Sequence, residues 1–159
     1  MAFAQKRARK VNNYFPVSGD YHDLRLYKDG TFDIVFEIEA VCYSAEKEKI
    51  FAEVGRVLKG GGLFILFDGY RRREKEKLTE DEAVARNLIE KGMALRELET
   101  YGSFLQKAED AHFIKTEEED LSDYVLPTME RLEKWGGQVF PASLTSKNNY
   151  QASAERSDL

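Results

Sequence analysis

Residues 56–70, RVLKGGGLFILFDGY, constrain the possible folds more than any other segment of the chain. Before the glycines, apolar residues recur at helical spacing and Lys59 stands in the last turn, as is typical of a helix end. After them, LFILF is a short continuous apolar run that predicts a buried strand. A phosphate-binding loop has the reverse order, in which a strand is followed by glycines and then by a helix whose free amides face the anion. The three glycines therefore predict a turn from a helix into a strand, and not a phosphate site.

A second strand is predicted in residues 32–41, FDIVFEIEAV, which are β-branched or aromatic over most of their length. This near-continuous apolar character is typical of a strand that is buried on both faces of a parallel sheet. Ser44 is the predicted N-cap of the helix between the two strands. The apolar residues of that helix fall on one face: Ile50, Phe51, Val54, Val57 and Leu58. The order strand, helix, strand predicts an α/β fold.

Weaker signals predict the elements on either side of this unit. A short basic helix at the N-terminus is followed by a short strand that ends near Asp20. Residues 71–108 are predicted to form a helical region, because Thr79 and Glu82 have the spacing of a capping box that would open a long helix running to about Gln106.

The C-terminal part is predicted to contain one short strand, in AHFIK, and then an amphipathic helix in residues 121–135 with Pro127 near its start. Two glycines, Gly136 and Gly137, are expected to end this helix. Residues 136–159 are polar and aperiodic, so they are predicted to be a poorly ordered tail. The domain itself is then expected to comprise residues 1–135.

The composition excludes several classes of protein. A length of 159 residues suits one domain, and a net charge of -5 argues against a general nucleic-acid binder. The single cysteine, Cys42, excludes an intrachain disulfide framework and fits a reducing compartment. No apolar run approaches the roughly 20 residues of a membrane span, and the N-terminus has no signal-peptide core. A cytoplasmic protein is the expectation.

Four segments together resemble a known family. The run from FDIV through RVLK and the glycines to the strand that ends in Asp68 is similar to the central part of class I S-adenosylmethionine-dependent methyltransferases. EIEAVCYS resembles a segment of the sterol C-24 methyltransferase branch, VSGDYHDL resembles the strand end that meets the adenine of the cofactor, and LSDYVLP resembles the substrate lid. The resemblance covers residues 3 to 135 and implies a partial Rossmann-like methyltransferase sheet with helices on its faces, residues 121–135 being lid-like.

The chain also departs from the family pattern. Gly60 stands where proline is usual, and LRLYKDGTFD is a poor match to the usual loop. The glycine-rich G-x-G-x-G turn that cradles the methionine part of the cofactor does not occur, and neither does the acidic residue that holds the ribose. By this comparison the chain is expected to be N-terminally truncated relative to the family.

The resemblance implies S-adenosylmethionine as the cofactor and assigns Asp20 to its adenine. Tyr21, which follows Asp20 and could pack on the adenine, and Glu37 are the other expected cofactor-binding residues. A turn-forming Gly-Asp pair is the alternative for Asp20, and a half-buried aromatic is the alternative for Tyr21. Glu37 and Glu39 are two residues apart on a strand, so they are expected on the same side. Such a carboxylate pair is costly to bury unless it is solvated, paired or functional. The resemblance favours Glu39 as the catalytic residue, and an ion pair with a nearby cation is the alternative.

The substrate pocket is expected to be lined by Tyr43, Asp68, Tyr70 and Tyr124, although core packing is the default role for tyrosines. Cys42 is expected to be a small buried filler, and two histidines are too few for a His-rich metal site. The implied function is methyl transfer to a small, apolar molecule. An inactive fragment that serves as an interaction or oligomerisation module is the alternative. An exposed sheet edge predicts a homodimer.

Overall fold

The computed structural model describes residues 2–139, which divide into two compact units, residues 2–114 and residues 115–139. In the first unit the elements follow the order α1 (Ala2–Ala8), β1 (Phe32–Ile38), the 3-10 turn η1 (Val41–Tyr43), α2 (Lys47–Val57), β2 (Leu58–Phe67), the 3-10 turn η2 (Lys75–Lys77), α3 (Glu80–Gly92) and α4 (Tyr101–Asp110). The second unit contributes α5 (Ser122–Val139).

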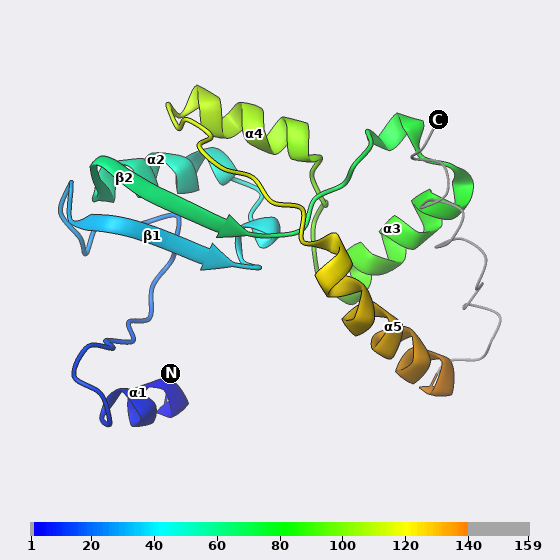
Figure 1. The fold of residues 1–159 in the computed structure, drawn as a ribbon, viewed down its shortest axis with the longest axis horizontal. Helices are drawn as coiled ribbons and strands as arrows, with labels where there is room; N and C mark the ends of the chain where they lie inside the picture. Colours follow the sequence, from blue (N-terminus) through cyan, green and yellow to red (C-terminus); the bar gives the residue numbers. More distant parts are fainter. Residues whose placement is uncertain (1, 140–159) are drawn as a thin grey trace. The chain divides into compact units, whose positions relative to one another are not determined.

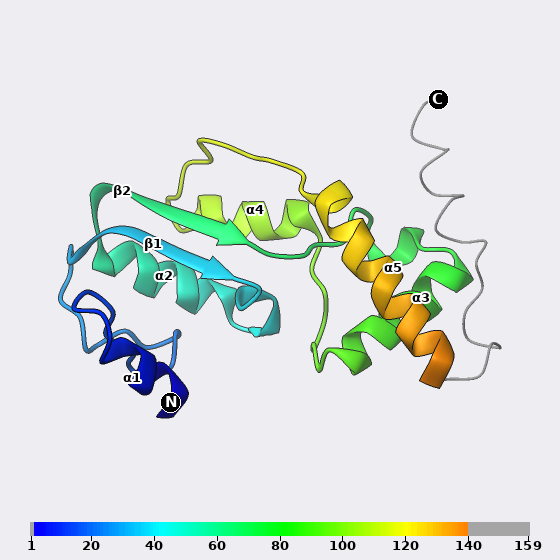
Figure 2. The same ribbon diagram turned by 60° about the horizontal axis from the view of Figure 1, so that its bottom comes forward.

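The sheet of the first unit consists of β1 and β2, which pair in parallel (Figures 1 and 2). The strand, helix, strand order predicted an α/β fold, and the structure confirms it. The carboxyl ends of β1 and β2 lie next to each other, because Ile38 pairs with Phe67.

The triple glycine lies at the start of β2 and causes a shift in register. Phe32 pairs with Leu58, whereas Ile34 already pairs with Leu63, so β2 uses extra residues over this interval. Gly61 has a φ of +78°, which side chains rarely adopt, and a Cβ on Gly62 would come within 3.0 Å of the Asp33 carbonyl oxygen. The glycines thus connect the helix that ends at Val57 to a strand, as predicted.

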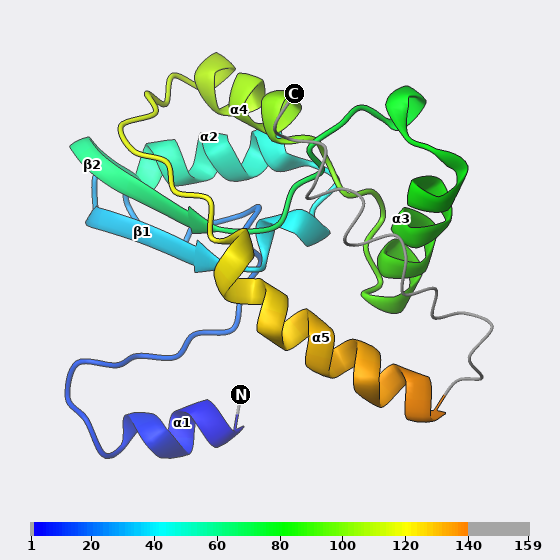
Figure 3. The ribbon, with the colours of Figure 1, turned by 45° about the vertical axis from the view of Figure 1, so that its right-hand side comes forward.

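The core lies between the sheet and the helices α2 and α4, which pack on one side of it (Figure 3). Apolar residues recur along α2 at intervals of three and four, so one face of this helix is buried. Phe51 is at the centre, and its ring contacts Phe64 of β2 and Phe104 of α4. The buried members of the cluster are Val41, Ile50, Phe51, Val54, Leu58 and Phe104.

The opposite face of the sheet is exposed within the first unit, so the expectation that both faces are buried is wrong for this unit. Its six side chains form three cross-strand pairs, and every one is apolar: Ile34 with Leu63, Phe36 with Ile65, and Ile38 with Phe67. They are between 38% and 66% exposed. The apolar pattern indicated burial, but in this unit the helices cover only the face that carries Val35, Phe64 and Leu66.

Two helix predictions are corrected near their ends. The helix α2 begins at Lys47 and not directly after Ser44, whose hydroxyl instead accepts a hydrogen bond from the Glu46 amide at 2.9 Å. The capping box of Thr79 and Glu82 is confirmed, but the helix that it opens ends at Gly92, and α4 begins only at Tyr101. The backbone between them turns at Ala94, where φ is 56°.

Two predicted strands do not form. Asp20 follows irregular backbone and makes only an isolated bridge to Asp23, and AHFIK continues α4 into irregular backbone. Short apolar stretches give no information about whether a neighbouring strand is present to pair with them. In the second unit, α5 runs past Gly136 and Gly137 to Val139. Residues 140–159 of the predicted tail lie outside the described residues.

Candidate functional site

The candidate site lies at the edge of the sheet where β1 and β2 end. Asp68 directly follows β2, and its carboxylate accepts hydrogen bonds from the Cys42 amide at 2.7 Å and the Gly69 amide at 2.8 Å. This side chain therefore ties the end of β2 to the η1 turn that follows β1. In open α/β sheets, ligands bind at this end of the strands.

Glu37, near the end of β1, turns its carboxylate toward the same turn. Its Oε2 atom accepts hydrogen bonds from the amides of Ala40 at 2.9 Å and Val41 at 3.2 Å. Its Oε1 atom is buried and has no hydrogen-bond partner among the described residues. Burial raises the pKa of Glu37, and the nearby carboxylates of Asp68 and Glu39 raise it further, against the two amide hydrogen bonds.

The raised pKa of Glu37 gives a testable pH dependence. An acid whose pKa is higher in the folded state holds its proton more tightly there, so stability falls as the pH rises from the unfolded pKa through the folded one. We expect Glu37→Gln to gain stability relative to the wild type as the pH rises from 4 to 8, measured by urea unfolding. The control is Asp33→Asn, whose carboxylate is 79% exposed at the other end of β1. A difference between Glu37→Gln and wild type that stays constant over this range contradicts the prediction.

Glu39 lies outside the strand, because β1 ends at Ile38. Its φ is 49°, in the left-handed region, and its amide donates to the Phe67 carbonyl at 2.7 Å. The strand alternation that placed Glu37 and Glu39 on one side therefore does not apply. Left-handed backbone at a residue other than glycine costs about 1 kcal/mol or more, and such residues cluster at functional sites. Its side chain is exposed.

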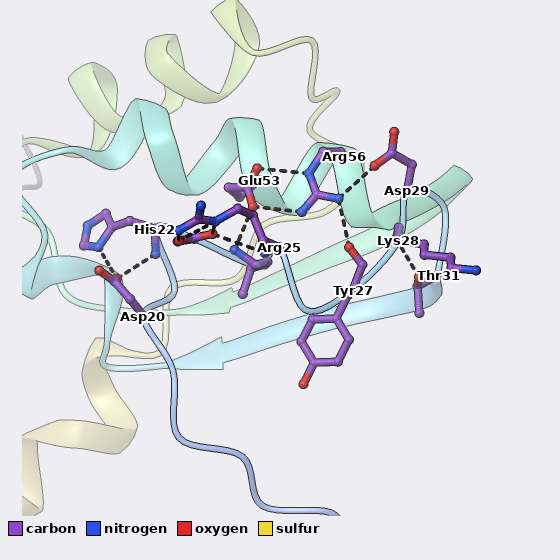
Figure 4. Close-up of polar contacts among 11 residues, drawn as sticks. Asp20, His22, Arg25, Tyr27, Lys28, Asp29, Thr31, Glu53 and Arg56 are labelled. Atoms are coloured by element: carbon purple, nitrogen blue, oxygen red, sulfur yellow. Dashed lines mark hydrogen bonds and ion pairs between the residues drawn. The ribbon is translucent and has the colours of Figure 1, made fainter.

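The loop before β1 is fastened to α2 by two side chains of that helix (Figure 4). The Arg56 guanidinium donates to the Tyr27 carbonyl at 3.0 Å and to the Asp29 carboxylate at 2.8 Å. Glu53, which pairs with Arg56 at 2.9 Å, also accepts from the Leu24 amide at 2.7 Å. The hydrogen bonds that the guanidinium donates to the carboxylates of Glu53 and Asp29 raise the pKa of Arg56, so this cross-link stays charged.

Asp20 stands at the start of that loop, in a turn and not at the end of a strand. One carboxylate oxygen, Oδ1, accepts from the His22 amide at 2.9 Å and contacts the His22 Nδ1 atom at 2.6 Å. These hydrogen bonds lower the pKa of Asp20. The turn that was the alternative for Asp20 is therefore present, and the side chain is nevertheless 66% exposed.

Tyr21 reaches from this turn to the end of β1. Its hydroxyl contacts the Ala40 carbonyl at 3.5 Å, and its ring is tilted over that of His22 at a centroid distance of 4.4 Å. Partial burial raises the pKa of Tyr21, as do Asp20, Cys42 and other acidic groups nearby. Asp20, Tyr21, Glu37 and Asp68 are thus gathered around the carboxyl ends of the two strands.

The predicted pocket tyrosines are not grouped in this way. Tyr70 packs edge-on against Tyr101 of α4 at a centroid distance of 5.6 Å and lies against the core cluster, where burial raises its pKa. Tyr43, in η1, is 44% exposed beside the site. Tyr124 lies on α5 in the second unit and is 77% exposed, so its pocket role stays a prediction.

Cys42 is half-buried, and burial together with the Asp68 carboxylate raises the pKa of its thiol to about 12. A thiol with this pKa is almost entirely protonated at neutral pH, which disfavours a nucleophilic role. Within residues 2–139, no three or more His, Cys, Asp or Glu side chains are grouped so that they could hold a metal ion.

Sequence reasoning missed His22 and Ser44 as members of this site. The two side chains are joined by a contact of 2.7 Å between Nε2 and Oγ, although they are 22 residues apart in sequence. The only local signal was the Asp20-x-His22 spacing, which allows a side chain to reach back to the residue two positions earlier.

Comparison with known proteins gives one consistent result. A methyltransferase domain family matches residues 1–66. The chain is 34% identical over 120 residues to 24-methylenesterol C-methyltransferase 2 of Arabidopsis thaliana. The aligned region covers 71% of the chain and 33% of that protein. It is also 42% identical over 64 residues to sterol methyltransferase-like 3 of Botryococcus braunii. That aligned region covers 40% of the chain and 16% of that protein. The chain thus spans a third or less of the length of these relatives.

A solved structure from Galdieria sulphuraria, assigned as a sarcosine dimethylglycine methyltransferase, shares the fold with a TM-score of 0.63 and 16% identity. It matches 96% of this chain, which corresponds to 54% of that protein. The chain belongs to the class I S-adenosylmethionine-dependent methyltransferases. Within that class it is sterol-methyltransferase-like, as the EIEAVCYS segment indicated.

Among the described residues, no helix is both long enough and apolar enough to cross a lipid bilayer.

Proposed function

We propose that this chain takes part in methyl transfer from S-adenosylmethionine to a small apolar acceptor of the sterol type. The observation that supports this best is the gathering of Asp20, Tyr21, Glu37 and Asp68 at the carboxyl edge of a parallel sheet. This edge is where the fold class binds its ligands. The acceptor class rests on the similarity to sterol methyltransferases.

The residues present fit the adenosine part of the cofactor. Asp20 uses Oδ1 for its own turn, so the other oxygen of this exposed carboxylate is available to accept from an adenine amino group. Tyr21 offers an aromatic face next to it. A shallow hollow of about 190 Å³ borders Asp20 and is lined by Val17, Gly19, Asp23, Leu24, Leu26 and Tyr27. Since binding pockets usually measure about 300–1,000 Å³, this hollow can border only part of such a ligand.

The cofactor supplies a methyl group on a sulfonium, which needs an aligned acceptor more than acid–base chemistry. The chain's own contribution is therefore to bind, to orient and to exclude water. We assign Glu39 the catalytic role, because its exposed carboxylate at the strand end could stabilise positive charge on an acceptor or receive its proton. Its left-handed backbone supports this role.

Calorimetric titration with S-adenosylmethionine tests the proposal. We expect micromolar binding, about -8 kcal/mol, and an affinity about tenfold lower for Asp20→Asn, whose amide loses the charge and one acceptor oxygen. Asp33→Asn is the matched control, because the Asp33 side chain is 79% exposed at the other end of β1, where among the described residues it pairs with Lys59. A folded wild-type chain that shows no binding rejects the proposed function for this chain.

We further propose that two copies associate through the exposed face of the sheet. At the roughly 150–250 Å² typical of a large apolar side chain, six residues exposed by 38–66% present about 600 Å². Two such faces together would bury about 1,200 Å², the lower end of stable interfaces. No charged residue lies among the six, so the net charge of -5 is not concentrated at this contact.

Light scattering at tens of micromolar protein checks this association. We expect the mass of two chains for the wild type and of one chain for Phe36→Lys, which places a cation at the centre of the face. Leu26→Lys is the control, since Leu26 is 73% exposed in the loop before β1. A wild-type mass of one chain contradicts the dimer.

The comparisons give no support to the alternative of an inactive interaction module. A cytoplasmic location remains part of the proposal and rests on the single cysteine and the composition.

A further inference from the structure

Three side chains from two separate segments form a continuous hydrogen-bonded chain beside the site. Asp20 Oδ1 lies 2.6 Å from His22 Nδ1, and His22 Nε2 lies 2.7 Å from Ser44 Oγ. Asp20 is 66% exposed, His22 is 23% exposed, and Ser44 is 5% exposed. The chain therefore runs from the surface of the loop to a buried residue directly after η1 (Figure 4 shows Asp20 and His22).

The direction of each hydrogen bond follows from the chemistry of the groups. An ionised carboxylate only accepts, so Nδ1 of His22 carries the proton, and in the neutral ring Nε2 then accepts from the Ser44 hydroxyl. The Ser44 oxygen in turn accepts from the Glu46 amide at 2.9 Å. Each group has one defined role, which fixes the imidazole between the loop and the start of α2.

The same order of groups occurs in serine hydrolases, but the surroundings disfavour that activity here. A nucleophilic hydroxyl must meet a substrate carbonyl together with donors for the oxyanion. Ser44 is almost fully buried, and its oxygen is already bound by the Glu46 amide. The arrangement is therefore suited to holding His22 in place and not to attacking a substrate.

His22 contacts both residues that are assigned to the adenosine part of the cofactor. Its amide and its Nδ1 atom occupy Oδ1 of Asp20, which leaves Oδ2 without a hydrogen bond from any described residue. Its ring lies against the Tyr21 ring at 4.4 Å. One imidazole thus sets the orientation of a carboxylate and of an aromatic ring on the exposed side of the loop.

We propose that His22 is the positioning residue of the cofactor-binding loop and holds Asp20 and Tyr21 in the orientation that receives adenine. The buried Ser44 hydroxyl holds the His22 ring in place through Nε2. This role rests on the proposed function. Preorganisation of this kind increases affinity, because the loop does not have to be ordered when the ligand binds.

Two amide substitutions separate the two hydrogen bonds of the ring. In His22→Asn the amide nitrogen stands near the position of Nδ1, so the donor to Asp20 is kept and the Ser44 bond is lost. In His22→Gln the amide reaches the position of Nε2, so the Ser44 bond is kept and the donor to Asp20 is lost. We expect the dissociation constants of S-adenosylmethionine and of 5′-methylthioadenosine to rise about tenfold for His22→Gln and less than about threefold for His22→Asn.

Three results would overturn the role of His22. The role is contradicted if both variants bind the ligands with unchanged affinity. It is also contradicted if both variants lose the same amount of affinity together with a drop in melting temperature, because this result indicates only a structural role. If the wild type binds neither ligand, the proposed function is rejected and the positioning role with it.

A ¹⁵N spectrum of the imidazole tests the hydrogen-bonded chain independently of any ligand. We expect the Nδ1–H tautomer in the wild type and a shifted Nε2 signal in Ser44→Ala, and a wild-type Nε2–H tautomer would overturn the network itself.

Discussion

Replacing Phe51 with alanine is expected to lower the free energy of unfolding by about 3–5 kcal/mol. The residue is 1% exposed, and its side chain extends from α2 into the core against β2 and α4. Its ring centroid is 5.2 Å from that of Phe104, 5.8 Å from that of Phe113 and 6.2 Å from that of Phe64. Alanine would remove all three aromatic contacts and leave a cavity, because the closely packed neighbours on β2, on α4 and in the segment after α4 cannot fill the space.

Urea unfolding at neutral pH measures this loss. Phe15→Ala is the matched control, because the same group is removed from a side chain that is 79% exposed. A change within about 0.5 kcal/mol is expected for that variant. Equal losses in both variants would show that the cluster around Phe51 is not the core of the folded chain.

Replacing Lys47 with methionine is expected to destabilise the fold by about 3 kcal/mol. The ammonium group is buried, donates to the Ser44 carbonyl at 2.8 Å and lies 3.6 Å from Oε2 of Glu99. That oxygen is itself buried and has no hydrogen-bond partner among the described residues. Without Lys47, the buried Oε2 atom would lose its nearby cation, and the carboxylate would be held only through Oε1, by Lys107 at 2.7 Å and the Ser103 hydroxyl at 2.5 Å among the described residues.

A double-mutant cycle with Glu99→Gln isolates this interaction. We expect the loss caused by Lys47→Met to be smaller in the Glu99→Gln background, because no buried charge is then left unpaired. Lys107→Met is the comparison, since its more exposed ammonium contributes only about 1 kcal/mol or less. Additive losses for Lys47 and Glu99 would show that the two charges do not interact.

The pH gives a further check on the same pair. Burial tends to raise the pKa of Glu99, but hydrogen bonds from Lys107 and Ser103 hold it below its ordinary value of 4.5. A carboxylate with a lowered folded pKa contributes stability above its unfolded pKa and loses it as the pH falls through the folded one. The cost of Lys47→Met is therefore expected to shrink as the pH falls below 4.5 towards the lowered pKa of Glu99, because the carboxyl group then becomes protonated.

Local patterns predicted the central unit well. The strand in FDIVFEI, the apolar face of α2 and the turn at the glycines all depend on residues within a few positions of one another. The predictions that failed depended on partners elsewhere. The residues before Asp20 do not pair with a neighbouring strand in the described part of the chain. The helix that was expected from Thr79 to about Gln106 is interrupted after Gly92.

The structure brings together some of the residues that were expected in the site. Asp68, Glu37 and Tyr21 lie at the strand ends, whereas Tyr70 packs against the core and Glu39 lies beyond the strand. Their roles stay proposals.

By itself, the sequence determined the alternation of strand, helix and strand and the need for glycine where the helix passes into β2, because apolar periodicity and backbone sterics act over short distances. Only the tertiary structure decided which polar groups meet. Leu24 and Glu53 are 29 positions apart, and His22 and Ser44 are 22 apart. A hydrogen bond requires placement within a few tenths of an ångström, and that placement is set by the packing of the loop, the sheet and α2 against one another.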